Sequence, residues 1–222
     1  MLDEKVRKAV VNYCNLDIIP NKTSRDEFDY PSQWFENYFS FLHDTNIVKH
    51  LGEAFYQARF MYKIMSGLRL SKAKYYAILK FQIIQYASIY EAILEYTIEK
   101  YFKNDFQKKY LRTEYHLNKS IMQVLKVTYK SQNYLPCTKK MVKKPIKLET
   151  IDLKTDFAVS KGIISQNTKD KIVSLYRLRN NVHILKAYET NYRPKIKEAI
   201  DAFKIMEPFI DEVKSFYNTT VK

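Results

Sequence analysis

Apolar side chains recur at helical spacing along most of the chain. The clearest run begins after Ser71, a suitable N-cap, and predicts one long helix ending at about Phe102. Its apolar and aromatic positions surround more than one face of a helix, which is typical of a helix packed against several neighbours in a bundle. These positions are Tyr75, Ile78, Leu79, Ile83, Tyr86, Ile89, Tyr90, Ile93, Leu94, Tyr96, Thr97 and Tyr101.

Shorter segments with the same spacing predict further helices on both sides of this one. Their ranges are Leu2 to Cys14, Ser32 to Leu68 with a break near Asp44 to Asn46, Asn118 to Tyr129, Asp152 to Ser160, a helix capped near Asn167 or Thr168 and running through Leu185, and a last helix from Pro194 through Phe216. Asn15 to Tyr30 is expected to be a polar loop, and the lysine-rich stretch around Pro136 and Pro145 a loop with at most a short hairpin.

These elements predict a mainly α fold with two parts. Residues 1–70 form an N-terminal helical extension packed on the core, and residues 71–222 form the helical core, with a basic, loop-rich insertion at about 103–150. The chain has only three glycines in 222 residues, whereas average usage of about 7% would give roughly fifteen. Glycine-rich phosphate loops and Rossmann turns are therefore excluded.

Positive charge is concentrated in the insertion. The whole chain carries a formal charge of +14, and the 47 residues from Tyr101 to Lys147 contribute twelve basic against two acidic residues. Tyrosines are interleaved with them, so the segment is a candidate RNA-binding surface, although a solvated lysine-rich surface explains the charge nearly as well. The candidate nucleic-acid-binding residues are Lys108, Lys109, Arg112, Lys139, Lys140, Lys143 and Lys144.

Other signals point to a reduced, cytoplasmic protein that needs no metal or organic cofactor. Cys14 and Cys137 fit neither a metal site nor a disulfide framework. The first residues carry charges of both signs where a secretory signal has an apolar core, and the run from Phe81 to Tyr90 is too short to cross a membrane. His43, His50 and His116 show no metal-ligand spacing.

One short segment contains residues suited to chemistry, Leu175 to Ile184. Here Arg177, Arg179, Asn180 and His183 follow one another within seven positions. If the helix continues through His183, Arg179 and His183 are four residues apart and lie on one face. A local structural role for these polar groups, with Arg179 paired to a core carboxylate, is the simplest explanation of the pattern alone.

The run from Gly162 to His183 resembles the motif-bearing helix of the HEPN (higher eukaryotes and prokaryotes nucleotide-binding) superfamily. The family pattern is an Arg, often followed by Asn, Asp or His, and then a His after four to six intervening residues. Five residues separate Arg177 from His183, which fits this pattern. Arg179 is followed directly by Asn180, as the pattern often requires, but only three residues separate it from His183. Both arginines are therefore candidates for the motif Arg. The stretch from Ala87 to Tyr96 is similar to the family's first core helix.

The resemblance implies an antiparallel helical bundle, commonly a homodimer, and a metal-independent endoribonuclease of the toxin or phage-defence kind. In active members the His performs acid–base chemistry on the ribose 2′-OH and the leaving oxygen, and the Arg stabilises the phosphorane. Asn180 would orient the substrate or the His, and Glu91 would hold the imidazole or the Arg, although a plain ion pair suits Glu91 as well. RNA and an antitoxin or regulatory protein are the implied partners, and no membrane is involved.

Two alternatives stay open at this point. The first is a non-catalytic HEPN-like module that binds nucleic acid or a protein partner, which the irregular spacing of the motif favours. The second is a helical scaffold whose lysines are merely solvated. Salt-dependent RNA binding would separate the scaffold from the other two, and nuclease activity would separate the enzyme from the binding module.

Overall fold

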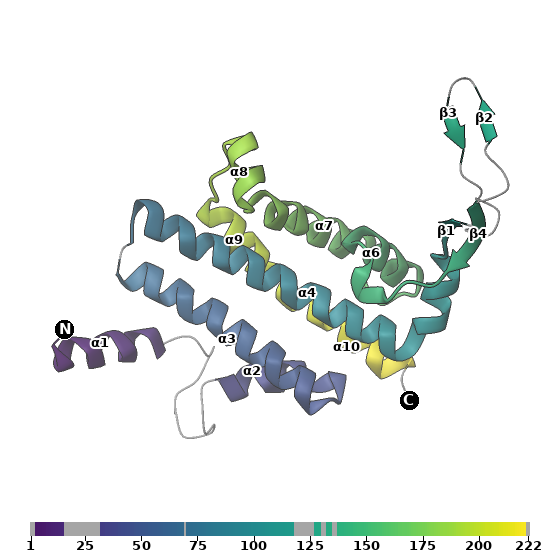
Figure 1. Cartoon of the computed structure of the whole chain (residues 1–222). Coiled ribbons are helices and arrows are strands. Elements are labelled where there is room, and N and C mark those ends of the chain that lie inside the picture. Colours follow the sequence, from purple (N-terminus) through teal and green to yellow (C-terminus); the bar gives the residue numbers. More distant parts are fainter. Residues whose placement is uncertain are drawn as a thin grey trace. The chain divides into compact units, whose positions relative to one another are not determined.

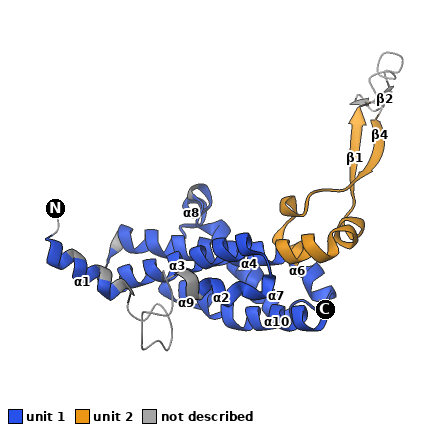
Figure 2. Ribbon diagram, turned by 90° about the horizontal axis from the view of Figure 1, so that it is seen from below, with its two compact units in different colours: residues 1–94, 155–222 blue, residues 95–154 orange. Residues whose placement is uncertain are grey.

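The protein is mainly α-helical in its computed structural model, which describes residues 3–15, 32–68, 70–117, 127–129, 132–134 and 137–220. Figure 1 labels the helices and strands along the chain, and Figure 2 colours the two compact units into which the chain divides. Unit 1 comprises residues 1–94 and 155–222, and unit 2 is Glu95–Lys154. Residues 1–70 and the part of the chain from Thr155 onward therefore share unit 1, and the basic insertion lies within unit 2. None of the described helices is both long enough and apolar enough to span a bilayer.

The helices in the first part of the chain are α1 (Glu4–Asn15), α2 (Ser32–Phe39), the short 3₁₀ helix η1 (Ser40–Leu42), α3 (Thr45–Gly67) and α4 (Lys72–Lys109). The break predicted near Asp44 is confirmed, because the Asp44 carboxylate caps α3 by accepting from the backbone N–H groups of Asn46 and Ile47. The polar loop expected between α1 and α2 lies outside the described residues.

Helix α4 is longer than its apolar spacing predicted. It continues to Lys109 across a kink at Phe102, whose backbone is not helical (φ −133°, ψ 15°). The predicted end at Phe102 is thus wrong, but it coincides with the kink. The helix passes from unit 1 into unit 2 at Glu95.

The second part of the chain contains the 3₁₀ helix η2 (Ile146–Leu148), α6 (Ile151–Ser160), α7 (Gln166–Asn181), α8 (Ile184–Thr190), α9 (Ile196–Lys204) and α10 (Met206–Thr220). The single last helix expected from Pro194 onward is two helices that meet at Ile205. Pro208 explains the break, because its ring removes an N–H and clashes with the carbonyl four residues earlier, at Lys204.

Aromatic residues of α4 form the centre of unit 1. The buried Tyr90 ring lies perpendicular to Phe209 of α10, with centroids 5.1 Å apart, and its hydroxyl donates to the carbonyl of Ala202 in α9 at 2.7 Å. Burial raises the pKa of Tyr90 well above its usual value. Phe55 of α3 packs against Tyr86 of α4 at 6.1 Å. The pattern-based expectation that this helix has several helical neighbours is therefore confirmed.

Helix α7, which contains the candidate motif, is fixed at its N-terminus. Gly162, in the left-handed conformation (φ 69°), ends α6 with paired backbone hydrogen bonds from Gly162 to Val159 and from Ile163 to Ala158. Ser165 then caps α7, two residues before Asn167 and three before Thr168, the two predicted caps. Its hydroxyl donates to Glu212 of α10 at 2.7 Å, and Thr168 donates to the same carboxylate at 2.9 Å. This network ties the start of α7 to α10.

Unit 2 contains two antiparallel strand pairs, where a helix and a loop with at most a short hairpin were expected. Strand β1 (Arg112–Leu117) pairs antiparallel with β4 (Cys137–Val142), and β2 (Val127–Tyr129) pairs with β3 (Gln132–Tyr134). The helix predicted over Asn118 to Tyr129 is therefore wrong at Val127–Tyr129, and residues 118–126 lie outside the described part. Two ion pairs support the unit: Arg112 with the buried Glu149, and the buried Lys154 with Glu95.

We expect Ser165→Ala to lower the free energy of unfolding by about 1 kcal/mol, because it removes the N-cap of α7 and one hydrogen bond to Glu212. For a protein of this size the melting temperature would fall by about 2–4 °C. Differential scanning calorimetry measures this change in melting temperature. Ser174→Ala, in the exposed middle of α7, is the matched control and should change the melting temperature little. Equal melting temperatures for both variants would contradict the assigned cap.

Candidate functional site

The candidate motif lies at the end of α7 and in the turn that joins it to α8. Helix α7 ends at Asn181, and His183 is the N-cap of α8 with an extended backbone (φ −63°, ψ 139°). The expectation of one helix running through Leu185, with Arg179 and His183 on a shared face, is wrong. Asn180, Asn181 and the β-branched Val182 are all poor helix formers, which favours a helix end at this point.

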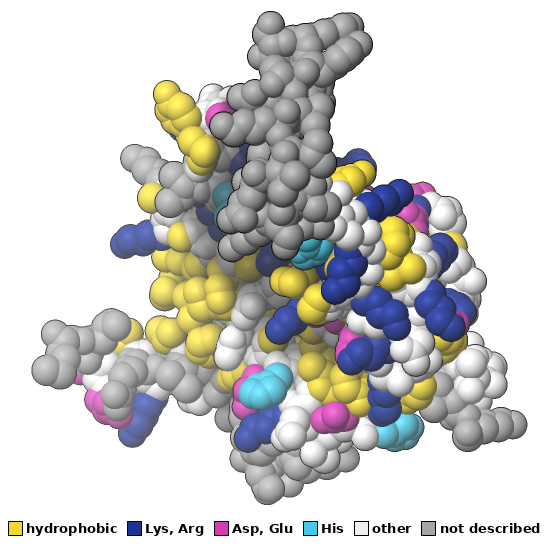
Figure 3. Space-filling model, turned by 45° about the vertical axis from the view of Figure 1, so that its right-hand side comes forward, with side chains coloured by type: hydrophobic (Ala, Val, Ile, Leu, Met, Phe, Trp, Pro, Cys, Tyr) yellow, Lys and Arg dark blue, Asp and Glu magenta, His cyan; other side chains and the backbone are white. Residues whose placement is uncertain are grey.

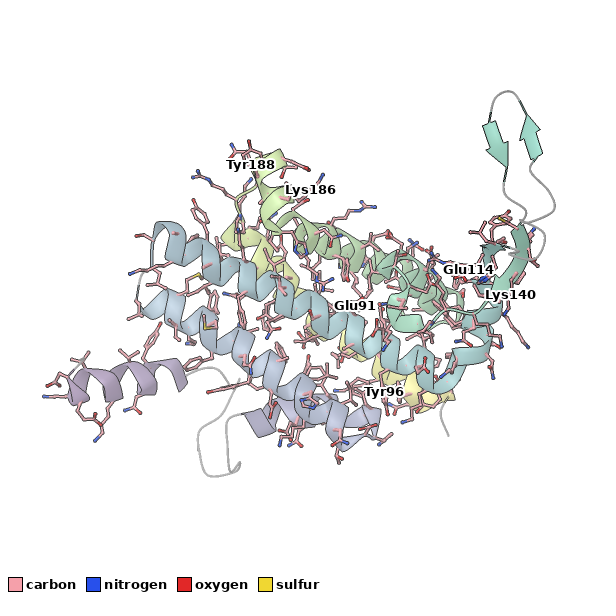
Figure 4. All side chains as sticks on the ribbon, viewed as in Figure 1. Glu91, Tyr96, Glu114, Lys140, Lys186 and Tyr188 are labelled. Carbon is pink, nitrogen blue, oxygen red and sulfur yellow. The ribbon has the colours of Figure 1, made fainter. Side chains whose placement is uncertain are left out.

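Arg179 faces α4 and is held there by two side chains. Its Nη1 group donates to the hydroxyl of Tyr176 and lies 3.8 Å from Oε2 of Glu91, while its guanidinium carbon is 4.6 Å from the centre of the Tyr176 ring. The Tyr176 hydroxyl in turn donates to Glu91 at 2.9 Å. Glu91, which Figure 4 labels on α4, was expected to hold either the imidazole or the Arg of the motif. In the structure Arg179 is the one of these that lies beside it.

Tyr176 completes this three-residue network, and the sequence analysis did not single it out. The only signal was its position three residues before Arg179, which puts the two side chains on neighbouring turns of the same helix face. Burial, the hydrogen bond to Glu91 and the negative charge of Glu91 raise the pKa of Tyr176 from 10.0 to about 12. The phenol therefore keeps its proton and its hydrogen bond across the whole physiological range.

Arg177, Asn180 and His183 are exposed, whereas Arg179 is half-buried. The three exposed residues follow one another at three-residue steps, Arg177 and Asn180 within α7 and His183 in the turn after it. The turn after α7 is tightened by backbone bonds from Val182 to Arg179 (3.3 Å) and from His183 to Asn180 (3.4 Å), each between residues three apart. Residues three apart nearly eclipse in such a 3₁₀-type turn. We call this set the Arg177–Asn180–His183 row.

The row brings together the chemical groups that act on a phosphodiester. A guanidinium fork binds two phosphate oxygens and keeps its charge, a neutral imidazole accepts a proton, and an amide both donates and accepts hydrogen bonds. Arg177 is three residues before Asn180, a spacing at which Cβ atoms on a helix are about 5–6 Å apart, and the turn places His183 three residues after Asn180. This arrangement suits an exposed, polyanionic substrate.

The candidate nucleic-acid-binding residues all belong to unit 2. Lys108 and Lys109 are exposed in the last turn of α4, Lys139 and Lys140 are exposed on β4, and Lys143 and Lys144 follow that strand. Arg112 differs from them, because its guanidinium is paired with buried Glu149 and so supports the fold of the unit. On the face shown in Figure 3, Lys and Arg side chains are interspersed with exposed hydrophobic ones.

The remaining histidines have no metal-binding geometry. His43 has a left-handed backbone (φ 52°) after η1, His50 lies 3.8 Å from Glu53, and His116 lies 3.6 Å from Glu114. Within the residues that the structure describes, no group of three or more His, Cys, Asp or Glu side chains is placed to hold a metal ion.

Comparison with protein-family models, with curated proteins and with solved structures finds no match for this chain. The site is therefore interpreted from its own geometry. The resemblance to the HEPN superfamily, and the homodimer and antitoxin partner that it implies, stay predictions.

We expect the stability of the protein to fall as pH rises above about 10, and part of this fall to depend on Tyr176. The pKa of Tyr176 is raised from 10.0 to about 12 in the folded protein. The stabilisation from its protonated phenol is therefore complete below the pKa of the unfolded state and is lost as pH rises through the pKa of the folded state. Urea unfolding between about pH 9 and pH 11.5 should show a shallower decline for Tyr176→Phe than for the wild type.

The matched control is Tyr188→Phe, because this tyrosine is 83% exposed on α8. Its unfolding free energy should follow the wild-type curve at every pH. Identical pH dependence for Tyr176→Phe and the wild type would mean that the Tyr176 phenol is not held by Glu91 in solution.

Proposed function

We propose that the chain is a metal-independent endoribonuclease of HEPN type, and that the Arg177–Asn180–His183 row is its reactive site. The observation that carries the proposal is the exposure of these three side chains at three-residue steps, with Arg177 and Asn180 in the last turns of α7 and His183 in the turn before α8. This juxtaposition agrees with the order of groups in the motif that the segment resembles, with Arg177 as its Arg.

The row suits cleavage by attack of the ribose 2′-OH. The His183 imidazole takes the proton of the 2′-OH, the 2′-oxygen forms a bond to phosphorus, and the bond from phosphorus to the 5′-oxygen breaks. The imidazolium then returns the proton to the leaving 5′-oxygen. Arg177 pairs with the non-bridging oxygens, whose negative charge increases in the transition state. The products are a 2′,3′-cyclic phosphate and a 5′-hydroxyl, so no water or metal ion is consumed.

Asn180 lies between the two reactive groups along the turn. Its amide is exposed and one 3₁₀ step from His183, close enough to hydrogen-bond either the substrate or the imidazole. In this proposal Asn180 is a positioning residue, which orients the ribose or the imidazole and takes no part in proton transfer.

Arg179 has a supporting role in this proposal. Its partners Tyr176 and Glu91 hold it toward α4, which fixes the rotation of the last turn of α7 and leaves Arg177, two residues before Arg179, on the exposed side of the helix. Its Nη2 and Nε groups donate to none of the residues that the structure describes. Because these donors could bind a phosphate, Arg179 is the alternative candidate for the motif Arg. Substitution of Arg177 and of Arg179 in turn distinguishes the two candidates.

The basic residues of unit 2 supply RNA affinity in this proposal. Lys108, Lys109, Lys139, Lys140 and Lys143 are exposed, and lysines of this kind bind phosphates with little dependence on base sequence. The expected signature is binding that weakens steeply with salt.

A second function, a non-catalytic module that binds RNA, is favoured by one observation. The imidazole of His183 makes no hydrogen bond with any described residue, whereas a histidine that acts as a general base is commonly oriented by a partner on its second nitrogen. A module of this kind would bind RNA through unit 2 and leave it intact.

Cleavage of transfer RNA and total RNA in the presence of EDTA tests the enzyme. We expect His183→Ala to lower the cleavage rate by about 10²–10⁴-fold, because it removes the acid–base group. Arg177→Ala should lower it by about 10²–10³-fold, since one cationic donor to the transition state is lost. Products of the wild type should carry 2′,3′-cyclic phosphate ends.

The matched control is Lys186→Ala, which removes an exposed cation from α8, three residues after His183, and should cleave at the wild-type rate. Arg179→Ala should lower the melting temperature, because Glu91 loses its cation, and should reduce the rate less than Arg177→Ala. A larger loss for Arg179→Ala than for Arg177→Ala would transfer the role to Arg179. Unchanged cleavage in His183→Ala would refute the proposed site.

A further inference from the structure

The two-stranded ribbon of unit 2 has two chemically different faces. Strands β1 and β4 pair so that Tyr115 is opposite Lys139, Thr113 opposite Met141, and Leu117 opposite Cys137. Because side chains alternate along a strand, these six residues share one face, and Arg112, Glu114, His116, Thr138, Lys140 and Val142 share the other. We call the first set the Tyr115 face.

All six side chains of the Tyr115 face are exposed to solvent. The fractions are 69% for Tyr115, 51% for Leu117 and 52% for Met141. Met141 does make one contact across the ribbon, with the hydroxyl of Thr113 at 3.3 Å from its sulfur. The Tyr115 ring makes no ring contact with a described residue. The side chains of Tyr115, Leu117 and Met141 therefore form an exposed aromatic and apolar surface.

An uncovered face of this kind is unusual for a ribbon of two strands. A two-stranded sheet gains most of its stability from a layer packed on one face, and exposed large apolar groups are typical of binding surfaces. In most ribbons the second layer belongs to the same domain. In this ribbon Tyr115, Leu117 and Met141 are each more than half exposed, so they are accessible to a binding partner.

The charge of the unit indicates what kind of partner it is. Residues 95–154 contain fourteen Lys and Arg against six Asp and Glu. Lys139 stands directly across from Tyr115, and the exposed Lys143 follows the same strand. An apolar protein surface would leave these cations without counter-charges, whereas a nucleic acid supplies phosphates for the lysines and flat bases for the ring.

We propose that the Tyr115 face binds unpaired RNA, with a base stacked on Tyr115 and the adjacent phosphate bound by Lys139. This inference rests on RNA being the ligand in the proposed function and adds the substrate class, single-stranded rather than duplex. The faces of bases in a duplex are covered by neighbouring bases, and only an unpaired segment exposes a base for stacking. Leu117 and Met141 extend the surface beside the ring.

Fluorescence anisotropy of labelled RNA tests the inference directly. The probe is a 12-nucleotide oligouridine, alone or annealed to oligoadenosine, added to full-length protein that carries His183→Ala so that the probe stays intact. Affinity for the single strand should fall about tenfold in Tyr115→Ala and should return in Tyr115→Phe, because stacking needs the ring and not the hydroxyl. The same substitution should leave affinity for the duplex unchanged.

The salt dependence separates stacking from charge. Lys139→Gln should reduce the slope of log affinity against log salt by about 0.7, the value for one phosphate contact on a single strand, whereas Tyr115→Ala should leave the slope unchanged. The matched control is His116→Ala, which removes a ring from the neighbouring position on the opposite face and should not alter single-strand affinity.

Several outcomes would overturn the inference. The first two are equal affinity of the wild type for single strand and duplex, and wild-type affinity for the single strand in Tyr115→Ala. A third is a loss of single-strand affinity in His116→Ala as large as that in Tyr115→Ala. A fourth is loss of self-association on gel filtration in Tyr115→Ala while RNA binding stays intact. Binding of the wild type to vesicles of phosphatidylcholine and phosphatidylserine that is lost in Tyr115→Ala, with no effect on RNA, would indicate a membrane instead.

The result also distinguishes this inference from the proposed function. Tyr115-dependent binding of single strands by a wild-type protein that cleaves no RNA would support the inference and refute the nuclease. Cleavage that depends on His183 while binding is indifferent to Tyr115 would support the nuclease and refute the inference. Near-ultraviolet circular dichroism of Tyr115→Ala, expected to differ little from the parent, verifies that the fold is retained.

Discussion

The hydrogen bond from the Tyr176 hydroxyl to Glu91 is the interaction on which the candidate site depends. It joins the last turns of α7 to α4, and Arg179 closes the same network by contacting both partners. A helix is rigid in rotation, so once Tyr176 and Arg179 are held inward, Arg177 must point outward. The network thus decides which of the two arginines is presented to a ligand. The opposite end of α7 is held independently by Ser165 and Glu212.

The two units contribute different physical properties. Unit 1 is built around buried aromatic rings and holds the polar row on a rigid helix end, which is the kind of support that a reactive site requires. Unit 2 has a small buried set, in which Glu149 and Lys154 are each satisfied by an ion partner, and leaves most of its lysines in solvent. Long-range attraction of a polyanion needs only such exposed charge, whereas catalysis needs geometry.

Helices with regularly spaced apolar positions were predictable from the sequence. Helices α1, α3, α4 and α6 lie where that spacing predicted helices, and in α3, α4 and α6 the spaced apolar side chains are largely buried. Strands β1 and β4 are exposed on both faces, so no alternation of apolar and polar residues marks them. Pro208 was a signal that the last helix divides into α9 and α10 at Ile205. The apolar residues before and after Ile205 keep one continuous helical spacing, and this outweighed the signal.

The site was predictable in composition but not in arrangement. Arg177, Arg179, Asn180 and His183 were identified from their order, and Glu91 was expected to face one of them. The end of α7 at Asn181 could not be predicted, because Leu178, Val182 and Leu185 keep the helical spacing of apolar residues through the turn. Tyr176 was missed since a tyrosine at an apolar position is indistinguishable from a core residue until the carboxylate opposite it is known.

The most direct test of the central claim is the NMR signal of the His183 imidazole during titration with an RNA oligonucleotide whose 2′-hydroxyls are methylated. Such a ligand binds without being cleaved, and His183→Ala assigns the signal among the four histidines of the chain. The account predicts a saturable shift of the His183 resonance that is weakened in Arg177→Ala and retained in Lys186→Ala. A His183 signal that does not move while the RNA is bound would contradict it.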